Sequence, residues 1–247
     1  NLLKDDPKYS LDGIGAYHLT LGRNKKSVEL DLKSDQGLKL FKELVSVADV
    51  VVDNFSQGVT KRLRIDHENL KDVNPKIITC SISGFGDTEV NRPAYDNLIQ
   101  GYAGAMSITG TDKENPVKSG IPIADLGAGL YAVIGILSAI QSREKNDSGE
   151  HVDISMLDTQ VSLLTYMATM HFLSGESPEP IGNQHMNHVP FNSYRTSDGF
   201  IQIGVVAEDF WPSLIKALDL KKLDTEENKL RIGRLKNREY IDQAVQE

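Results

Sequence analysis

Apolar residues in the first part of the chain follow two patterns in turn, one typical of strands and one typical of helices. Apolar runs at 49–55 and 75–86 predict buried strands, and the alternating run at 27–32 predicts another. Residues 34–48 carry apolar side chains at helical spacing, with Ser34 as the expected N-cap. Strands that alternate with helices indicate an α/β fold with a Rossmann-like parallel sheet, in which ligands bind beyond the carboxyl ends of the strands. Those ends are predicted at Lys33, Asn54–Phe55 and Ser83–Phe85.

The longest apolar stretch predicts a helix from Ala128 to Ile140 that is apolar nearly all round and therefore buried. Asp125 stands at its beginning, where an aspartate is a favoured N-cap because its oxygen accepts an amide hydrogen bond. Gly127 and Gly129 leave the first turn bare, so a ligand can approach the backbone closely. A carboxylate beside bare amides is also suited to reaction. The pattern alone leaves both interpretations of Asp125 open.

The second part of the chain predicts a change of domain. His151–Ile154 predicts a strand, followed by a helix capped by Ser155 with Asp158 in a structural role. A segment rich in Gly, Pro, Asn and His then predicts a linker, and Asp198-Gly199 predicts the turn of a β-hairpin. We therefore expect a large domain over 1–173, a linker over 174–191 and a smaller α+β domain over 192–247. The absence of an initial Met and an ending inside an amphipathic pattern suggest truncation, with the large domain lacking its first strand and helix and the small domain incomplete.

Composition narrows the class of partner. The net charge of −8 argues against nucleic acid or an anionic membrane as a partner, and no apolar run is long enough to predict a membrane span. The single cysteine, Cys80, excludes an internal disulfide and suits the cytoplasm. His185 and His188 are three residues apart without acidic neighbours, so we expect no metal site there.

Five segments, taken in order, resemble the family III CoA-transferases, the formyl-CoA and carnitine CoA-transferase type related to the α-methylacyl-CoA racemases. The segments are 24–63, 81–86, 94–110, 124–140 and 151–164. The resemblance implies a Rossmann-like large domain, a small domain, and a homodimer whose two chains are interlocked. It implies a cytoplasmic enzyme that acts on acyl-CoA and a small carboxylic acid, with coenzyme A as part of the substrate and no tightly bound cofactor or metal.

The resemblance also implies roles for individual residues. Asp125, in "ADLGAG", matches the nucleophile that forms an aspartyl-CoA thioester. Gly127 and Gly129 would supply backbone donors to the oxyanion, and the helix N-terminus would keep Asp125 ionised. The contacts with CoA match Leu30, Lys33, Asn54, Phe55, Arg62 and Phe85.

Two other functions compete with transfer. The racemase branch needs a histidine that moves a proton at the α-carbon, and Tyr95 stands at that position here. Because a tyrosine is a poor base near neutral pH, we favour transfer over racemisation. The remaining alternative is an inactive fragment that only binds CoA.

Overall fold

The computed structural model describes residues 3–90 and 92–247, and its centre is a parallel sheet of three strands. The order is β3 (Val50–Asp53), β4 (Ile78–Ser83), β5 (His151–Ser155), with β4 in the middle. Val50 pairs with Ile78 and Thr79 pairs with His151, so all three strands end at the same edge. The sheet confirms the predicted α/β class and the three strands expected at these positions.

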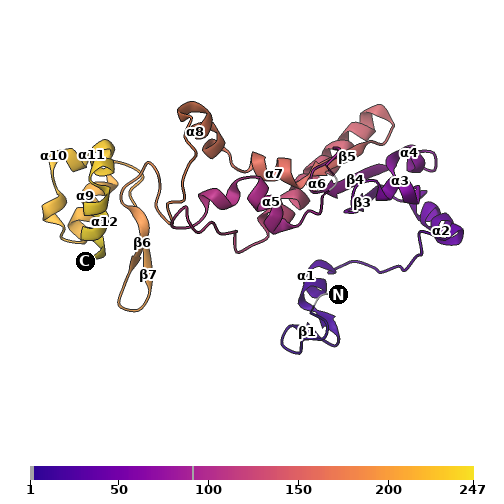
Figure 1. Cartoon of the computed structure of the whole chain (residues 1–247), viewed down its shortest axis with the longest axis horizontal. Coiled ribbons are helices and arrows are strands. Elements are labelled where there is room, and N and C mark those ends of the chain that lie inside the picture. Colours follow the sequence, from indigo (N-terminus) through magenta and orange to yellow (C-terminus); the bar gives the residue numbers. More distant parts are fainter. Residues whose placement is uncertain (1–2, 91) are drawn as a thin grey trace.

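Several helices precede, separate and follow these strands along the chain, and the longest of them packs on the sheet (Figure 1). Ser34 caps the first of them by accepting a hydrogen bond from the amide of Gly37 at 3.0 Å, and Ser155 caps another through the amide of Asp158 at 3.0 Å. Both predicted caps are confirmed. The helices are α2 (Asp35–Val45), α3 (Val59–Leu63), α4 (His67–Lys71), α5 (Asp96–Tyr102), α6 (Ile123–Asn146), α7 (Met156–Ser162) and α8 (Tyr166–Ser174), with a 3₁₀ turn at Ala105–Ile108.

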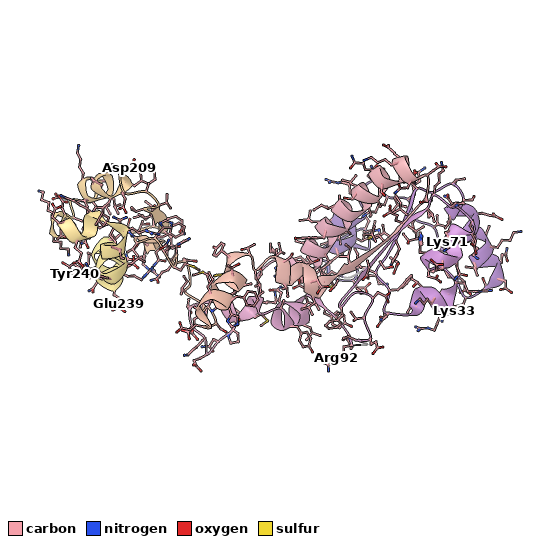
Figure 2. All side chains as sticks on the ribbon, turned by 90° about the horizontal axis from the view of Figure 1, so that it is seen from above. Lys33, Lys71, Arg92, Asp209, Glu239 and Tyr240 are labelled. Carbon is pink, nitrogen blue, oxygen red and sulfur yellow. The ribbon has the colours of Figure 1, made fainter. Side chains whose placement is uncertain are left out.

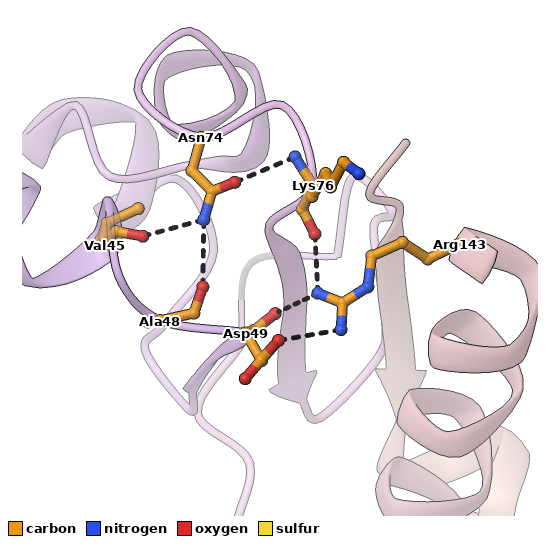
Figure 3. Close-up of polar contacts among 6 residues, drawn as sticks. All are labelled: Val45, Ala48, Asp49, Asn74, Lys76 and Arg143. Carbon is orange, nitrogen blue, oxygen red and sulfur yellow. Dashed lines mark hydrogen bonds and ion pairs between the residues drawn. The ribbon is translucent and has the colours of Figure 1, made fainter. Parts of the chain in front are cut away.

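Arg143 fastens the carboxyl end of α6 to the amino edge of the sheet (Figure 3). Its guanidinium donates to the carbonyl of Lys76 at 3.0 Å and pairs with the carboxylate of Asp49 at 2.9 Å. Asn74 makes a separate contact between the end of α2 and the segment before β4, because its side-chain amide donates to the carbonyls of Val45 and Ala48 at 3.1 and 3.0 Å. The long helix therefore has a fixed direction across the sheet, with its N-terminus at the carboxyl edge.

The prediction that α6 is buried on all sides is wrong, because one of its faces is exposed in the part of the chain that the structure describes. α6 packs on β4 and β5 through its small residues, and a Cβ at Gly135 would lie 2.6 Å from Val152. The opposite face is open, with Leu130 67% and Leu137 60% exposed. By length and composition alone, α6 is the one helix in the described part of the chain that would suffice to cross a membrane, which corrects the expectation that no run is long enough. Its packing on the sheet is equally typical of a core helix of a globular domain.

The predicted strand at 27–32 is also wrong. Residues 25–31 carry neither helix nor strand, and Val28 is 67% exposed. A short N-terminal unit stands apart from the sheet and joins it through this irregular segment (Figure 1). It consists of β1 (Ser10–Leu11), β2 (Ile14–Gly15) and α1 (Ala16–Leu21).

The C-terminal elements gather at the other end of the elongated molecule (Figure 1). The predicted hairpin is confirmed, with Arg195 opposite Phe200 at its turn, and the core beside it is built around Trp211. Residues 175–190 contain no helix or strand. The division at 173 and 192 stays a prediction. The elements are β6 (Phe191–Arg195), β7 (Phe200–Gly204), α9 (Phe210–Ala217), a 3₁₀ turn at Lys221–Leu223, α10 (Glu226–Lys229), α11 (Arg231–Lys236) and α12 (Arg238–Gln246).

Candidate active site

The turn that follows β3 presents Asn54 and Phe55 at the carboxyl edge of the sheet. Asp53 fixes this turn, because one carboxylate oxygen accepts the amide of Phe55 at 3.1 Å and the other accepts the hydroxyl of Ser81 at 2.7 Å. Phe55 is 43% exposed as a residue and belongs to no core cluster among the described residues. Its position suits a flat ring of a ligand stacked on it.

A cleft of about 570 Å³ opens beside this turn. Its walls come from the ends of β3 and β4, from the loop before α5, and from the first turn of α6, where Asp125 lies. The cleft therefore occupies the carboxyl edge of the parallel strands, as predicted for a ligand site in this fold class. Its lining residues of most chemical interest are Asn54, Phe55, Ser83, Arg92, Tyr95, Asp96 and Asp125.

Asp125 is not the cap of its helix. α6 begins at Ile123 after Pro122, which places Asp125 in the first turn rather than at the N-cap. The cap is supplied by Asp96, whose Oδ1 accepts the amides of Ala124 and Asp125 at 2.9 and 3.3 Å. The structural interpretation of Asp125 is thereby corrected, since a different carboxylate satisfies the helix end.

Electrostatics at Asp125 also differ from expectation. Partial withdrawal from water raises the pKa of the Asp125 carboxyl, and the nearby charge of Asp96 raises it further. We had expected the helix N-terminus to favour the ionised form. The first-turn amides that would do so are already bonded to Asp96. The residue as a whole is exposed, and it is one of the residues that line the cleft.

Gly127 and Gly129 do not have the geometry of oxyanion donors. Both lie beyond the first four residues of α6, so their amides belong to the helix's own hydrogen-bond ladder. Gly127 instead permits close packing, because a Cβ there would lie 3.1 Å from Thr159 on α7. The expectation that these two amides face a tetrahedral intermediate is corrected on that ground.

The residues expected to bind CoA separate into two groups. Asn54, Phe55 and Phe85 line the cleft with Asp125. Phe85 also packs against the core and meets the ring of Tyr102 edge-on at 5.9 Å. Leu30, Lys33 and Arg62 do not line it, and Figure 2 shows Lys33 well apart from Arg92.

Two lining residues were given no role by sequence reasoning, although Ser83 was placed at the predicted end of its strand. The Ser83 hydroxyl is buried and has no hydrogen-bond partner among the described residues, so it is free to bond a ligand. Arg92 is the one Lys or Arg among the described residues of the cleft wall. Its place three residues before Tyr95 was the available signal.

A second hollow of about 490 Å³ adjoins the cleft and shares Phe55, Ser83 and their neighbours with it. Its floor is the polar face of the sheet, where the Thr79 hydroxyl bonds Nδ1 of both His67 and His151, at 3.0 and 2.8 Å. Lys61 on α3 also lines it. The combined space extends from Asp125 along the ends of two strands. No group of three or more metal-ligating side chains occurs among the described residues.

Fold and cleft together define a Rossmann-like α/β protein with two carboxylates and an arginine at the carboxyl ends of its strands. The chain belongs to CoA-transferase family III, whose model matches residues 4–247. It is 33% identical to a succinyl-CoA:mesaconate CoA-transferase from Haloarcula hispanica over 99% of this chain and 64% of that protein. It is 32% identical to the human succinyl-CoA:glutarate CoA-transferase over 94% of this chain and 53% of that protein.

A solved structure has the same fold. A CAIB/BAIF family protein from Brucella suis superposes with a TM-score of 0.85 at 34% identity, covering 96% of this chain and 64% of that one. The chain thus spans less than two thirds of the length of these relatives.

Proposed function

We propose that this chain carries the nucleophile of a CoA-transferase that moves CoA from an acyl-CoA to a carboxylic acid through an aspartyl-CoA thioester at Asp125. The observation that carries the proposal is that Asp125, which does not cap its helix, lines a cleft that also holds Asn54 and Phe55. The relatives' names support the reaction class, since they are CoA-transferases.

The reaction proceeds by exchange of acyl partners without oxidation or reduction. An Asp125 oxygen attacks the donor thioester carbon, the C–S bond breaks, and the CoA thiolate leaves behind a mixed anhydride. The thiolate attacks the aspartyl carbonyl and expels the donor acid, which gives the aspartyl-CoA thioester. The acceptor carboxylate then attacks the aspartyl carbonyl, which expels the CoA thiolate and forms a second mixed anhydride. The thiolate attacks the acceptor's carbonyl carbon in this anhydride, the bond from that carbon to the Asp125 oxygen breaks, and the new acyl-CoA and the free Asp125 carboxylate result. Covalent catalysis divides one difficult exchange into easier steps and keeps the thioester energy.

The other proposed contacts follow the cleft. Phe55 offers a stacking face for the adenine, and Asn54 and Phe85 flank it. Leu30, Lys33 and Arg62 are proposed to contact the outer parts of CoA, with the two cations near phosphates. Ser83 is proposed to donate its free hydroxyl to the substrate.

We further propose that the acids exchanged are dicarboxylates. Relatives are named for succinyl-CoA with mesaconate or glutarate, and another, from Acetobacter aceti, for acetyl-CoA with oxalate. Arg92 supplies a guanidinium in the cleft wall, and such a fork binds a carboxylate through two hydrogen bonds. Arg92→Gln should raise KM for a dicarboxylate by about tenfold to a hundredfold, the value of a charge-assisted hydrogen bond, and leave monocarboxylates unchanged. Arg64→Gln, which removes an exposed arginine paired with Asp35 at 3.5 Å, is the matched control.

Assembly and compartment are expectations of the same proposal. The open apolar face of α6, with Leu130 and Leu137, supports a homodimer that covers it. Light scattering behind size exclusion tests this directly, and a monomer at all concentrations would contradict it. The single buried thiol, Cys80, supports the cytoplasm.

The decisive experiment traps the intermediate. Incubation with a donor acyl-CoA and hydroxylamine should convert Asp125 to a hydroxamate that peptide mass spectrometry locates. Asp125→Asn should abolish the adduct and the turnover. Asp158→Asn is the control, because Asp158 also lies in the first turn of a helix but not on the cleft wall. An adduct that persists in Asp125→Asn rejects the proposed function, and deuterium exchange at the α-carbon without an adduct favours a racemase.

A further inference from the structure

The N-terminus of α6 is satisfied by groups from outside the helix. Pro122 has no amide hydrogen, and the amide of Ile123 bonds the carbonyl of Ile121 at 2.8 Å. The next two amides, of Ala124 and Asp125, both donate to Oδ1 of Asp96. One oxygen of Asp96 therefore holds the backbone at the residue that carries the proposed nucleophile.

Gln100 holds the other oxygen of Asp96. Its side-chain amide donates to Asp96 Oδ2 at 2.6 Å, and its Oε1 accepts the backbone amide of Ser119 at 2.8 Å. Gln100 is only 1% exposed, so both of its bonds are made in a protected environment. The pair consequently ties three segments together: α5, the loop that leads into α6, and the first turn of α6.

A buried apolar cluster adjoins this network. Ile99, next to Gln100, forms a buried cluster with Ala124, Ala128 and Met156. Ala124, which precedes Asp125, is thus held by apolar contacts. The amides of both residues are held by the carboxylate of Asp96.

This inference rests on the proposed role of Asp125. We propose that Asp96, held in place by Gln100, is the positioning residue of the site, which fixes the backbone that presents Asp125 and leaves the Asp125 carboxylate free to react. A misplacement of about 1 Å is enough to slow a reaction by on the order of a hundredfold, so such a device has a measurable effect.

Asp96 also acts through its charge. The titratable or charged side chains that line the cleft with Asp125 are Tyr95, Asp96 and Arg92. Of these, Asp96 contributes to raising the pKa of Asp125, after the larger effect of burial. Removing the charge while keeping an acceptor oxygen separates the two roles, and Asp96→Asn does so.

The test measures Asp125 directly and catalysis separately. The pKa of Asp125 is read from its carboxyl-carbon NMR signal in the full chain, and loading is read as single-turnover formation of aspartyl-CoA. Asp96→Asn should lower the pKa of Asp125 and slow loading by less than about tenfold, because an amide oxygen still accepts from the backbone. Asp96→Ala and Gln100→Leu should slow loading by about a hundredfold.

Ser34→Ala is the matched control, since Ser34 caps α2 with a 3.0 Å bond away from the cleft. It should lower the melting temperature while leaving the Asp125 pKa and the loading rate unchanged. An unchanged Asp125 pKa in Asp96→Asn, or loading in Asp96→Ala equal to that of the unaltered chain, overturns the inference. If Asp125 never becomes loaded even in the unaltered chain, the proposed function fails, while the NMR titration still decides whether Asp96 governs Asp125.

Discussion

Arg234 is a buried charged residue beside the C-terminal core around Trp211. It is 1% exposed, and its guanidinium lies 5.2 Å from the centre of the Trp211 ring. We consider Arg234→Met, which keeps most of the apolar stem and removes the five donors. The lost partners are the carbonyls of Val189, Asn228 and Lys229, at 2.9, 2.9 and 3.0 Å, and the carboxylate of Glu208 at 2.9 Å.

The carbonyl groups that lose their donor account for most of the expected loss in the free energy of unfolding. Val189 and Asn228 are buried, and each carbonyl left without a donor costs about 1–3 kcal/mol. Glu208 is 53% exposed, so its ion pair contributes about 1 kcal/mol or less. Because the contacts share one group and are not additive, we expect a loss of about 3–5 kcal/mol, the usual cost of removing one partner from a buried charged network.

Trp211 provides the assay. It is the only tryptophan in the chain, so its fluorescence in a urea titration reports on the C-terminal core that surrounds it. Arg195→Met is the control, because that arginine lies 5.3 Å from the Phe200 ring but is exposed, and it should change stability by less than about 1 kcal/mol. A loss in Arg234→Met no larger than in the control would refute the assignment of the guanidinium as the organiser of this core.

Three further outcomes are expected. The amide of Arg231, followed by the Arg234 guanidinium, holds the pKa of Glu208 below its usual value, so stability is full above the unfolded pKa near 4.3 and falls as the pH drops through the folded value. Glu208→Gln should reduce the acid dependence of the urea unfolding midpoint measured by Trp211 fluorescence. An unchanged dependence of that midpoint on pH would contradict the link between the Glu208 pKa and stability. Burial raises the pKa of Cys80 to about 11, so native protein should resist alkylation at about pH 8 until urea unfolds it. Gly149→Ala would place a Cβ 1.9 Å from a backbone carbonyl oxygen and should cost about 1–3 kcal/mol in a thermal melt; a neutral effect would reject the close approach.

Local features of the fold were predictable because local chemistry determines them. Ser34 and Ser155 each cap a helix with an oxygen three residues from the amide that it accepts, and that spacing is visible in the sequence. β4 needed only a short apolar run followed by a glycine turn. The cleft at the carboxyl edge then follows from parallel strands, and Asn54 and Phe55, predicted at a strand end, line it together with Asp125.

Features that depend on distant partners were not predictable. The run at 27–32 alternates like a strand, but a strand also needs a neighbour, and among the described residues none pairs with it. The apolar pattern of α6 fixed its helical period but not how much of its surface the chain would cover. Asp96 was visible as a polar residue at the head of a helix, yet its partners lie at the start of α6, beyond the reach of any local pattern.

The two interpretations of Asp125 exclude each other for a physical reason. A carboxylate that caps a helix has its oxygens bonded to amides, which stabilise its charge and reduce its reactivity toward a carbonyl carbon. Here Asp96 takes the bonds, and Asp125 keeps its oxygens while its pKa rises through burial and through the charge of Asp96. Two carboxylates in unlike environments can thus serve unlike roles, one structural and one chemical. The proposed role of Asp125 as nucleophile therefore depends on Asp96, which caps the helix and leaves the Asp125 carboxylate without that function.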